Sequence, residues 1–226
     1  MKDEASRLDL LTTVYCLLLP VANRANHYEA AFEEYLRWRG VPYVAVDESR
    51  RSLLAEGESL KSLDFIVSSS GGPSWLVDVK GRRFPSGSAG KQYWKNWSTH
   101  DDLESLTRWE AIFGAGFRGL LVFAYNIVGD RAPLAKEQLF EHRGALYAFL
   151  GVPLGDYAAC CRRISIRWDT VSMPAADFRR LARHIDEFVL GESAVSPPAR
   201  PAAARRCKSG PEPLQVQDEP GENGVA

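Results

Sequence analysis

The sequence predicts an α/β fold with a mixed central sheet flanked by helices, because helical segments alternate with short apolar strands. Residues 26–40 combine helical periodicity with signals for both helix ends. Residues 63–67 and 75–80 are apolar runs joined by a turn that contains glycine and proline, as in two adjacent strands. Residues 119–128, GLLVFAYNIV, form an unbroken apolar run that is typical of a buried strand. Together these segments predict a sheet with helices packed on it.

The composition is that of one folded domain followed by a tail. Of the 226 residues, 45% are hydrophobic and 11% are aromatic, which is enough for a core. From about Glu192 the chain is rich in proline and poor in large apolar residues, so we expect residues 192–226 to be disordered. The folded domain is expected at residues 1–191, with its core at about 26–128 and a C-terminal addition at 129–191.

The charge of the chain is close to neutral. Lys and Arg number 28 and Asp and Glu 29, for a formal net charge of −1. A globally basic nucleic-acid-binding protein is therefore not indicated, and any such surface must be local. The four cysteines show neither CxxC spacing nor a disulfide framework, which favours a reducing compartment. The N-terminal apolar run, residues 14–22, is too short to span a bilayer. We therefore expect a cytoplasmic protein without a membrane segment.

The N-terminal third is predicted to be mostly helical and then extended. Residues 7–22 are expected to form a helix or an apolar arm that packs on the main body. Asn26 is a good helix N-cap, Glu29 follows it as in a capping box, and Gly40 is a good C-terminal stop. The apolar stripe between them is Tyr28, Ala31, Phe32, Tyr35 and Leu36. Residues 41–47 then favour a strand.

After the two adjacent strands, residues 85–90 are expected to form a flexible loop. Thr99 or Asp101 can cap a helix that ends near Phe113. The side chains expected to face inward from this helix are Leu103, Leu106, Trp109 and Ile112 or Phe113. This helix leads into the buried strand at residues 119–128.

The C-terminal addition is expected to contain further strands and a helix. We predict a strand at residues 146–152, a helical turn near Asp156 and an extended segment at 164–171. Trp168, within that segment, is expected in the core. A last helix is predicted to start at Pro174. Its apolar residues would be Phe178, Leu181, Ala182, Ile185 and Phe188 or Val189.

Charged residues occur in the two adjacent strands, where a buried strand would ordinarily avoid them. Asp64 lies in the first strand, and Asp78 and Lys80 lie in the second. Because residues i and i+2 of a strand share one face, Asp78 and Lys80 point the same way, and pairing of the strands can bring Asp64 beside them. Two carboxylates and an amine at one sheet edge form a candidate site for a divalent metal and a phosphate.

The order helix, strand, strand, strand, helix, strand, with these acidic residues and lysine, resembles the PD-(D/E)XK nuclease superfamily. The resemblance implies a restriction-endonuclease-like fold with an αβββαβ core, here over residues 26–128. The first acidic residue of the family falls on Asp64, which follows leucine instead of proline. The second-strand signature falls on Asp78, Val79 and Lys80.

The resemblance further implies a Mg²⁺-dependent phosphodiesterase that hydrolyses nucleic acid, with DNA expected rather than RNA. Asp64, Asp78 and the carbonyl of Val79 would bind Mg²⁺, for which Mn²⁺ can substitute. Lys80 would orient the attacking water or stabilise the transition state. The helix glutamate of the family falls best on Glu29, which would hold a second metal or a metal-bound water. Glu33, one helical turn later, is the competing residue.

A basic and aromatic segment follows the candidate site. Its phosphate-contacting residues would be Arg82, Arg83, Lys91, Gln92 and Lys95, and Tyr93, Trp94 or Trp97 could stack on unpaired bases. The same charges also fit a solvated face. A homodimer is compatible with the sequence.

Other interpretations of these residues stay open. Asp64 and Asp78 could be turn residues with Lys80 as a surface partner, and Glu29 could be only a capping residue. The main functional alternative is a catalytically inactive nuclease-fold module that binds nucleic acid or a protein partner. A third interpretation is an unrelated α/β scaffold in which the two strands have only a structural role.

Overall fold

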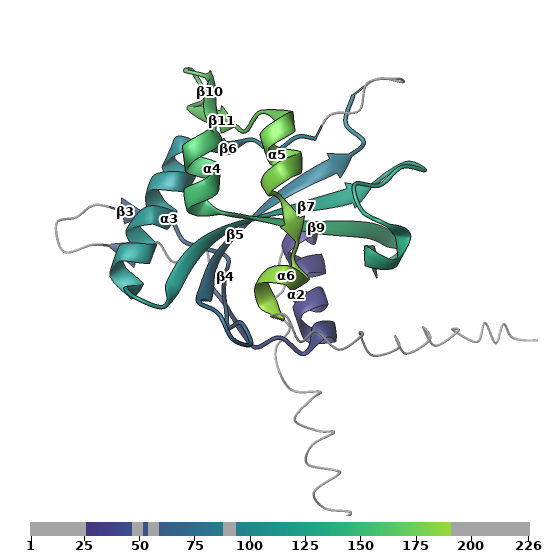
Figure 1. Cartoon of the computed structure of the whole chain (residues 1–226), viewed down its shortest axis with the longest axis horizontal. Helices are drawn as coiled ribbons and strands as arrows, with labels where there is room; N and C mark the ends of the chain where they lie inside the picture. The colour runs from purple at the N-terminus through teal and green to yellow at the C-terminus, as the bar shows by residue number, and fades with distance from the viewer. Residues whose placement is uncertain (1–25, 47–51, 54–58, 88–93, 191–226) are drawn as a thin grey trace, which may run out of the picture.

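A mixed sheet forms the centre of the protein in the computed structural model, which describes residues 26–46, 52–53, 59–87 and 94–190 (Figure 1). The strands lie in the order β1-β4-β5-β7-β9-β12, and β8 pairs with β9. Their bounds are β1 (Tyr43–Ala45), β4 (Phe65–Val67), β5 (Ser74–Phe84), β7 (Phe117–Ile127), β8 (Phe140–His142), β9 (Ala145–Pro153) and β12 (Arg183–His184). The β5–β7 pair is parallel and the other pairs are antiparallel, so the sheet is mixed.

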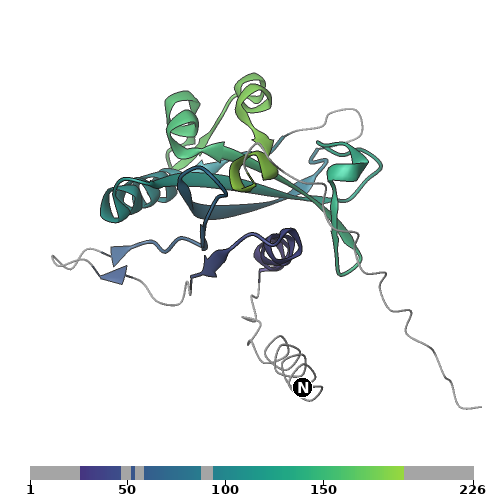
Figure 2. The ribbon, with the colours of Figure 1, turned by 60° about the horizontal axis from the view of Figure 1, so that its bottom comes forward.

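Helices cover both faces of this sheet. The helix α2 (His27–Arg39) lies on one face, and α3 (His100–Phe113), α4 (Leu154–Cys160) and α5 (Ala175–Leu181) lie on the other (Figure 2). The alternation of β5 divides its side chains between two apolar clusters. Trp75, Val77 and Val79 join the cluster that contains the buried residues of α2, whereas Leu76 and Phe84 join the cluster on the α3 side.

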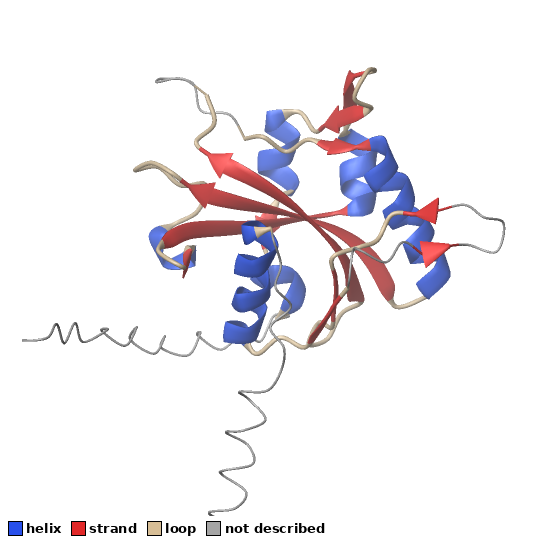
Figure 3. Cartoon of the chain, turned by 180° about the vertical axis from the view of Figure 1, so that it is seen from behind, coloured by secondary structure: helices blue, strands red, loops and turns tan. Residues whose placement is uncertain are grey.

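The predicted αβββαβ core is confirmed by the chain order α2, β1, β4, β5, α3, β7. The chain therefore has the α/β, restriction-endonuclease-like class of fold that the sequence predicts. Two small sheets are added to this core. One is the pair β2 (Ser52–Leu53) and β3 (Ser59–Leu60), and the other joins β6 (Ser98–Thr99), β10 (Arg162–Ser165) and β11 (Thr170–Ser172) (Figure 3). The remaining elements are η1 (Lys136–Gln138) and α6 (Asp186–Val189).

The helix ends follow the local signals in the sequence. The side chain of Asn26 accepts from the N–H of Tyr28 at 3.1 Å, and Gly40 ends α2 in the left-handed conformation with φ of 66°. At the start of α3 the Thr99 hydroxyl accepts from the N–H of Asp102, whose carboxylate accepts from the N–H of Thr99. Thr99, and not Asp101, is therefore the N-cap, and it forms a reciprocal capping box.

One sequence-based expectation is confirmed with narrower bounds, and two are wrong. The predicted strand at 41–47 is limited to Tyr43–Ala45 within the described residues. The predicted helix from Pro174 to Val189 is broken, because residues 183–184 leave it to pair with the edge of β9. Trp168 lies in the turn between β10 and β11, away from both apolar clusters, and is 68% exposed. The predictions for residues 7–22 and 192–226, and part of the predicted loop at 85–90, lie outside the described residues.

No helix in the described part of the chain is long and apolar enough to cross a membrane.

One glycine of β5 permits close packing of α2 on the sheet. A Cβ atom at Gly81 would lie less than 3.0 Å from three ring atoms of Tyr28. We expect Gly81→Ala to lower the free energy of unfolding by about 1–3 kcal/mol, because the ring must move and α2 is held by its core contacts. Urea unfolding followed by circular dichroism measures this change.

Gly155 in α4 is the matched control, because a Cβ atom there would meet nothing within 4 Å. Gly155→Ala is expected to leave stability unchanged or to raise it by up to about 1 kcal/mol, since alanine favours the helix. Equal stability of the two variants would contradict the close packing inferred at Gly81.

Candidate active site

One open cleft of about 320 Å³ receives side chains from α2, the approach to β4, and β5. Its lining residues are Glu29, Lys61, Ser62, Asp64, Asp78, Val79 and Lys80. These include all the residues that the sequence nominated for metal binding and catalysis. The structure thus brings together positions that are up to about fifty residues apart in the sequence, and it adds Lys61 and Ser62.

Asp64 is bound to the edge of β5. It lies in a bend immediately before β4, where its N–H donates to the carbonyl of Val77 at 2.9 Å. Its carboxylate accepts from the N–H of Val79 at 2.5 Å. Because the N–H and C=O of one strand residue point to the same side, the carbonyl of Val79 faces this edge as well. The carboxylate of Asp64 and the carbonyl of Val79 therefore place oxygen atoms at the same edge of β5.

Lys80 lies between two carboxylates. Its ammonium nitrogen is 2.7 Å from an oxygen of Asp78 and 2.8 Å from an oxygen of Asp102. Burial by itself would lower the pKa of Lys80, but the negative charges of Asp78 and Asp102 outweigh it and raise the pKa above its usual value. We therefore expect Lys80 to be a cation near neutral pH and not to act as a general base.

Asp78 has a different electrostatic environment from Asp102. Burial raises the pKa of Asp78, and the nearby negative charge of Asp102 adds to this, while the ammonium of Lys80 opposes it. Burial would also raise the pKa of Asp102. The charge of Lys80 and hydrogen bonds from Lys61, Lys80 and the N–H of Thr99 reverse that effect, so the pKa of Asp102 lies well below its usual range. Asp102 is thus the firmly ionised partner of Lys80.

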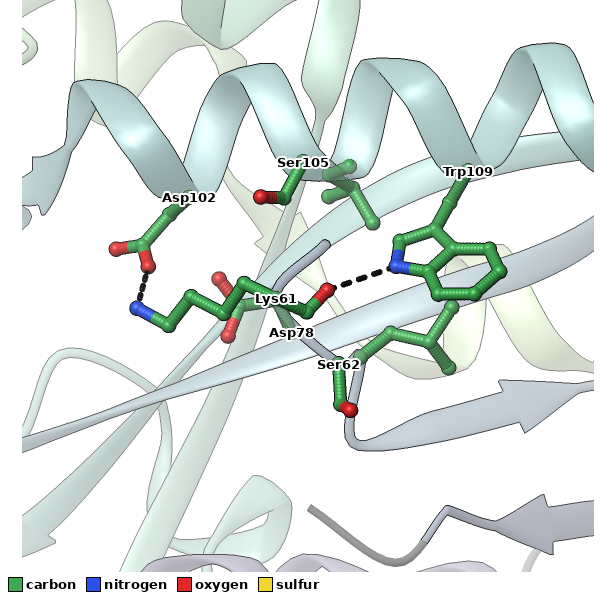
Figure 4. Close-up of a pocket in the computed structure, with 8 residues that line it drawn as sticks. Lys61, Ser62, Asp78, Asp102, Ser105 and Trp109 are labelled. Atoms are coloured by element: carbon green, nitrogen blue, oxygen red, sulfur yellow. Dashed lines mark hydrogen bonds and ion pairs between the residues drawn. The ribbon is translucent and has the colours of Figure 1, made fainter. Parts of the chain in front are cut away.

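Asp102 is buried at the start of α3 and organises the surrounding polar groups. It accepts from the hydroxyl of Ser98 at 2.8 Å and forms an ion pair with Lys61 (Figure 4). Trp109, two turns along the same helix, donates its ring N–H to the carbonyl of Lys61 at 2.8 Å (Figure 4). The helix α3 therefore holds Lys61 by both its side chain and its backbone.

Asp102 and Lys61 are site residues that the sequence analysis missed. The spacing of Thr99 and Asp102 is that of a capping box, which could have drawn attention to Asp102 as a helix-start residue. That signal carries no information on its contact with Lys80, which depends on how α3 packs on β5. Lys61 lies in a polar connection and has no distinguishing local signal.

The structure separates the two glutamates that the sequence left in competition. Glu29 lines the cleft, and the side-chain amide of Asn26 donates to its carboxylate. Glu33 does not line the cleft, and its carboxylate accepts from Arg37 at 2.6 Å and from the Tyr43 hydroxyl at 2.9 Å. Of the two, Glu29 is the one placed to act in the cleft.

The residues predicted to contact nucleic acid are only partly described. The guanidinium of Arg82 lies 3.8 Å from the ring centroid of Trp97 and donates to the Trp97 carbonyl. Burial lowers the pKa of Arg82 below its usual value. Arg83 and Lys95 are exposed. Lys91 and Gln92 lie outside the described residues.

The oxygen atoms of the cleft fit a hard divalent cation. Asp64, Asp78 and the carbonyl of Val79 supply three oxygen donors, and Mg²⁺ needs few protein ligands because it keeps several waters. Within the described residues, no group of three or more His, Cys, Asp and Glu side chains is close enough to form a metal site by itself. Any cation here would therefore be held by two carboxylates, a backbone carbonyl and water.

Among solved structures, the chain is similar to Hjc, a Holliday junction resolvase from the archaeal hyperthermophile Archaeoglobus fulgidus. The TM-score is 0.43 and the sequence identity is 11%, over 72% of this chain and 97% of that chain. No family model matches the sequence, and no curated protein matches it significantly. The function of this chain is therefore inferred from its own residues.

Proposed function

We propose that this protein is a divalent-metal-dependent nuclease that hydrolyses phosphodiester bonds, with DNA as its polymer. The observation that carries the proposal is the convergence of Glu29, Asp64, Asp78 and Lys80 on one open cleft. Carboxylate oxygens for a metal and an ammonium for a phosphate are the groups that this hydrolysis requires. Structural aspartates in unrelated turns would have no reason to share a cleft with a half-buried lysine.

Each residue has a distinct task in this mechanism. Asp64, Asp78 and the Val79 carbonyl would hold Mg²⁺ or Mn²⁺, which supplies Lewis-acid activation of water and neutralises phosphate charge. Lys80 places a fixed positive charge beside the substrate phosphate and stabilises negative charge as it develops there. Asp102 keeps that ammonium protonated and in position. Glu29, which also lines the cleft, would accept a hydrogen bond from a water molecule there.

A second function is favoured by one specific contact. The 2.7 Å ion pair between Lys80 and Asp78 occupies the carboxylate that would bind the metal. A nuclease-fold module without catalysis, which binds nucleic acid or a protein through this cleft, would retain such a pair. Titration calorimetry distinguishes the two functions, because the module should show no Mg²⁺ or Mn²⁺ binding that depends on Asp64 and Asp78.

The decisive test is cleavage by the full chain in the presence and absence of metal. The substrates are plasmid, single-stranded and branched DNA, and single-stranded RNA, each with Mg²⁺, Mn²⁺ or a chelator. We expect cleavage of at least one DNA substrate with metal and none with the chelator. The Asp78→Asn variant, purified in the same way, is the control. Its loss of cleavage would assign the activity to this chain, because cleavage by a contaminating nuclease would persist. A wild type that cleaves none of the DNA substrates in the presence of metal would contradict the proposal.

A further inference from the structure

A small hairpin outside the cleft has a surface that the proposed chemistry does not use. The strands β10 and β11 form this hairpin, which stands out from the body of the protein beside α4 (Figure 1). Three large apolar side chains are exposed on it: Ile164 by 61%, Ile166 by 84% and Trp168 by 68%. Side chains of this kind exposed together on a soluble protein mark a binding surface.

The charge of the hairpin identifies the class of partner. Arg162, Arg163 and Arg167 are all exposed, and Asp169 is the single acidic residue between Arg162 and Thr170. Arg163 pairs with Asp169 at 3.1 Å, and the guanidinium of Arg167 lies 5.1 Å from the ring centroid of Trp168. An indole with a guanidinium beside it, surrounded by arginines in a nearly neutral protein, is complementary to a polyanion that also carries flat rings.

The hairpin is joined to the candidate active site through the short strand β6. Thr170 of β11 pairs with Thr99 of β6, and the N–H of His100 donates to the carbonyl of Asp169 at 2.9 Å. Ser98, also in β6, donates to Asp102, which holds Lys80. The base of the hairpin is therefore fixed to the same helix start that positions the lysine of the cleft.

A second exposed indole lies in the segment that joins β5 to β6. Trp97 immediately precedes β6, is 40% exposed and carries the guanidinium of Arg82 over its ring. Arg82 lies on the same face of β5 as Lys80, two residues farther along the strand. Within the described residues, the two exposed tryptophans are Trp97 and Trp168, and each has an arginine beside the ring. Trp97 directly precedes β6, and Trp168 lies in the turn before β11, the strand that pairs with β6.

We propose that the β10–β11 hairpin binds unpaired bases of nucleic acid and directs the cleft to junctions between paired and unpaired DNA. Trp168 would stack on an unpaired base, with Ile166 packing beside it, and the three arginines would contact the adjacent phosphates. Base stacking is independent of sequence, so the preference would be for substrate structure. This substrate class rests on the proposed nuclease function, but the binding itself does not require catalysis.

The test measures binding in a chelator, so that cleavage cannot interfere. Fluorescence anisotropy gives the dissociation constants of the full-length protein for a forked duplex, a fully paired duplex and a single strand. We expect Trp168→Ala to weaken binding of the forked duplex and the single strand about tenfold, and of the paired duplex less than about twofold. Arg167→Ala should weaken binding of all three and reduce the dependence of log Kd on log salt by about one.

Two matched variants control for the loss of an exposed side chain elsewhere. Ile112→Ala removes an exposed apolar side chain of α3, and Arg118→Ala removes an exposed arginine of β7. Both should bind every DNA as the wild type does. Hairpin variants that bind forked DNA like the wild type would overturn the proposal. A wild type that binds no DNA, or that self-associates through Trp168 in analytical ultracentrifugation, would also overturn it.

The outcomes separate this inference from the proposed nuclease function. Selective binding of forked DNA that depends on Trp168, without cleavage when Mg²⁺ or Mn²⁺ is added, would support the hairpin and contradict the nuclease. Metal-dependent cleavage with equal rates for wild type and Trp168→Ala on forked DNA would support the nuclease and contradict the role of the hairpin.

Discussion

Replacement of Lys80 by methionine is expected to lower the rate of metal-dependent cleavage by about 10²–10³-fold, the effect of removing one preorganised electrostatic group. Lys61→Met is expected to lower it by less than about tenfold. Both lysines pair with Asp102, but their positions differ. The side chain of Lys80 is 13% exposed and pairs with Asp78 as well, whereas that of Lys61 is 49% exposed, where solvent screens its charge.

The pH dependence gives a second readout of Lys80. The two neighbouring carboxylates raise the pKa of Lys80, so its ammonium persists beyond the usual lysine range. The rate of the wild type should therefore show no decrease from loss of this proton below about pH 10. A decrease with an apparent pKa between 7 and 9 that vanishes in Lys80→Met would mean that Lys80 titrates as a general base, contrary to this prediction.

The measurement is steady-state cleavage of the best substrate of the wild type, over a range of metal concentrations. Thermal unfolding of both variants controls for stability, because Lys80→Met leaves two carboxylates without their shared cation. Rates are compared below the lower unfolding temperature. Equal cleavage rates for Lys80→Met and Lys61→Met would contradict a specific role of Lys80 in catalysis.

Asp102→Asn is expected to lower the free energy of unfolding by about 2–3 kcal/mol at pH 7. The substitution removes the buried charge that pairs with two lysines and weakens the cap at the start of α3. Asp101 is the matched control, since it lies one residue earlier in the same helix turn and is exposed. Asp101→Asn should change stability by less than about 0.5 kcal/mol. Urea unfolding measures both variants.

The effect of Asp102 should also depend on pH in a defined direction. Its pKa is lower in the folded protein than the ordinary value near 4, so its stabilising contribution is present above about pH 4. That contribution is lost as the pH falls below 4. In this range the carboxylate at position 102 binds a proton in the unfolded chain, whereas in the folded protein it stays ionised to lower pH. The stability difference between wild type and Asp102→Asn should therefore shrink from pH 5 to pH 3. A difference that is constant over this range would contradict the ionised pair with Lys80.

The elements that could be predicted from the sequence are those fixed by local chemistry. Asn26 and Gly40 set the ends of α2, and the apolar run at 119–128 falls on β7 except for its last residue. Pairing of the two adjacent strands follows from their turn and their apolar side chains. The break between α5 and α6 could not be predicted, because it depends on the free edge of β9, which lies some thirty residues earlier in the sequence. The helical periodicity across 174–189 predicts one continuous helix and gives no sign that residues 183–184 pair with β9.

The candidate site divides in the same way. Asp78 and Lys80 could be placed together from strand alternation, and Glu29 and Asp64 from the order of the elements. Lys61 and Asp102 could not, because their roles arise only when α3 packs against β5 and brings the two lysines to one carboxylate. Local patterns identify groups within one element, and contacts between elements require the fold.

Gly81 links the stability of the protein to the width of the cleft. Tyr28, which packs against Gly81, adjoins Glu29 in α2, and Gly81 adjoins Lys80 in β5. The absence of a side chain at Gly81 therefore allows α2, which carries Glu29, to approach the strand that carries Lys80. We expect a larger residue at this position to move Glu29 away from Lys80 even where the protein still folds, so that it would affect the cleft as well as the packing.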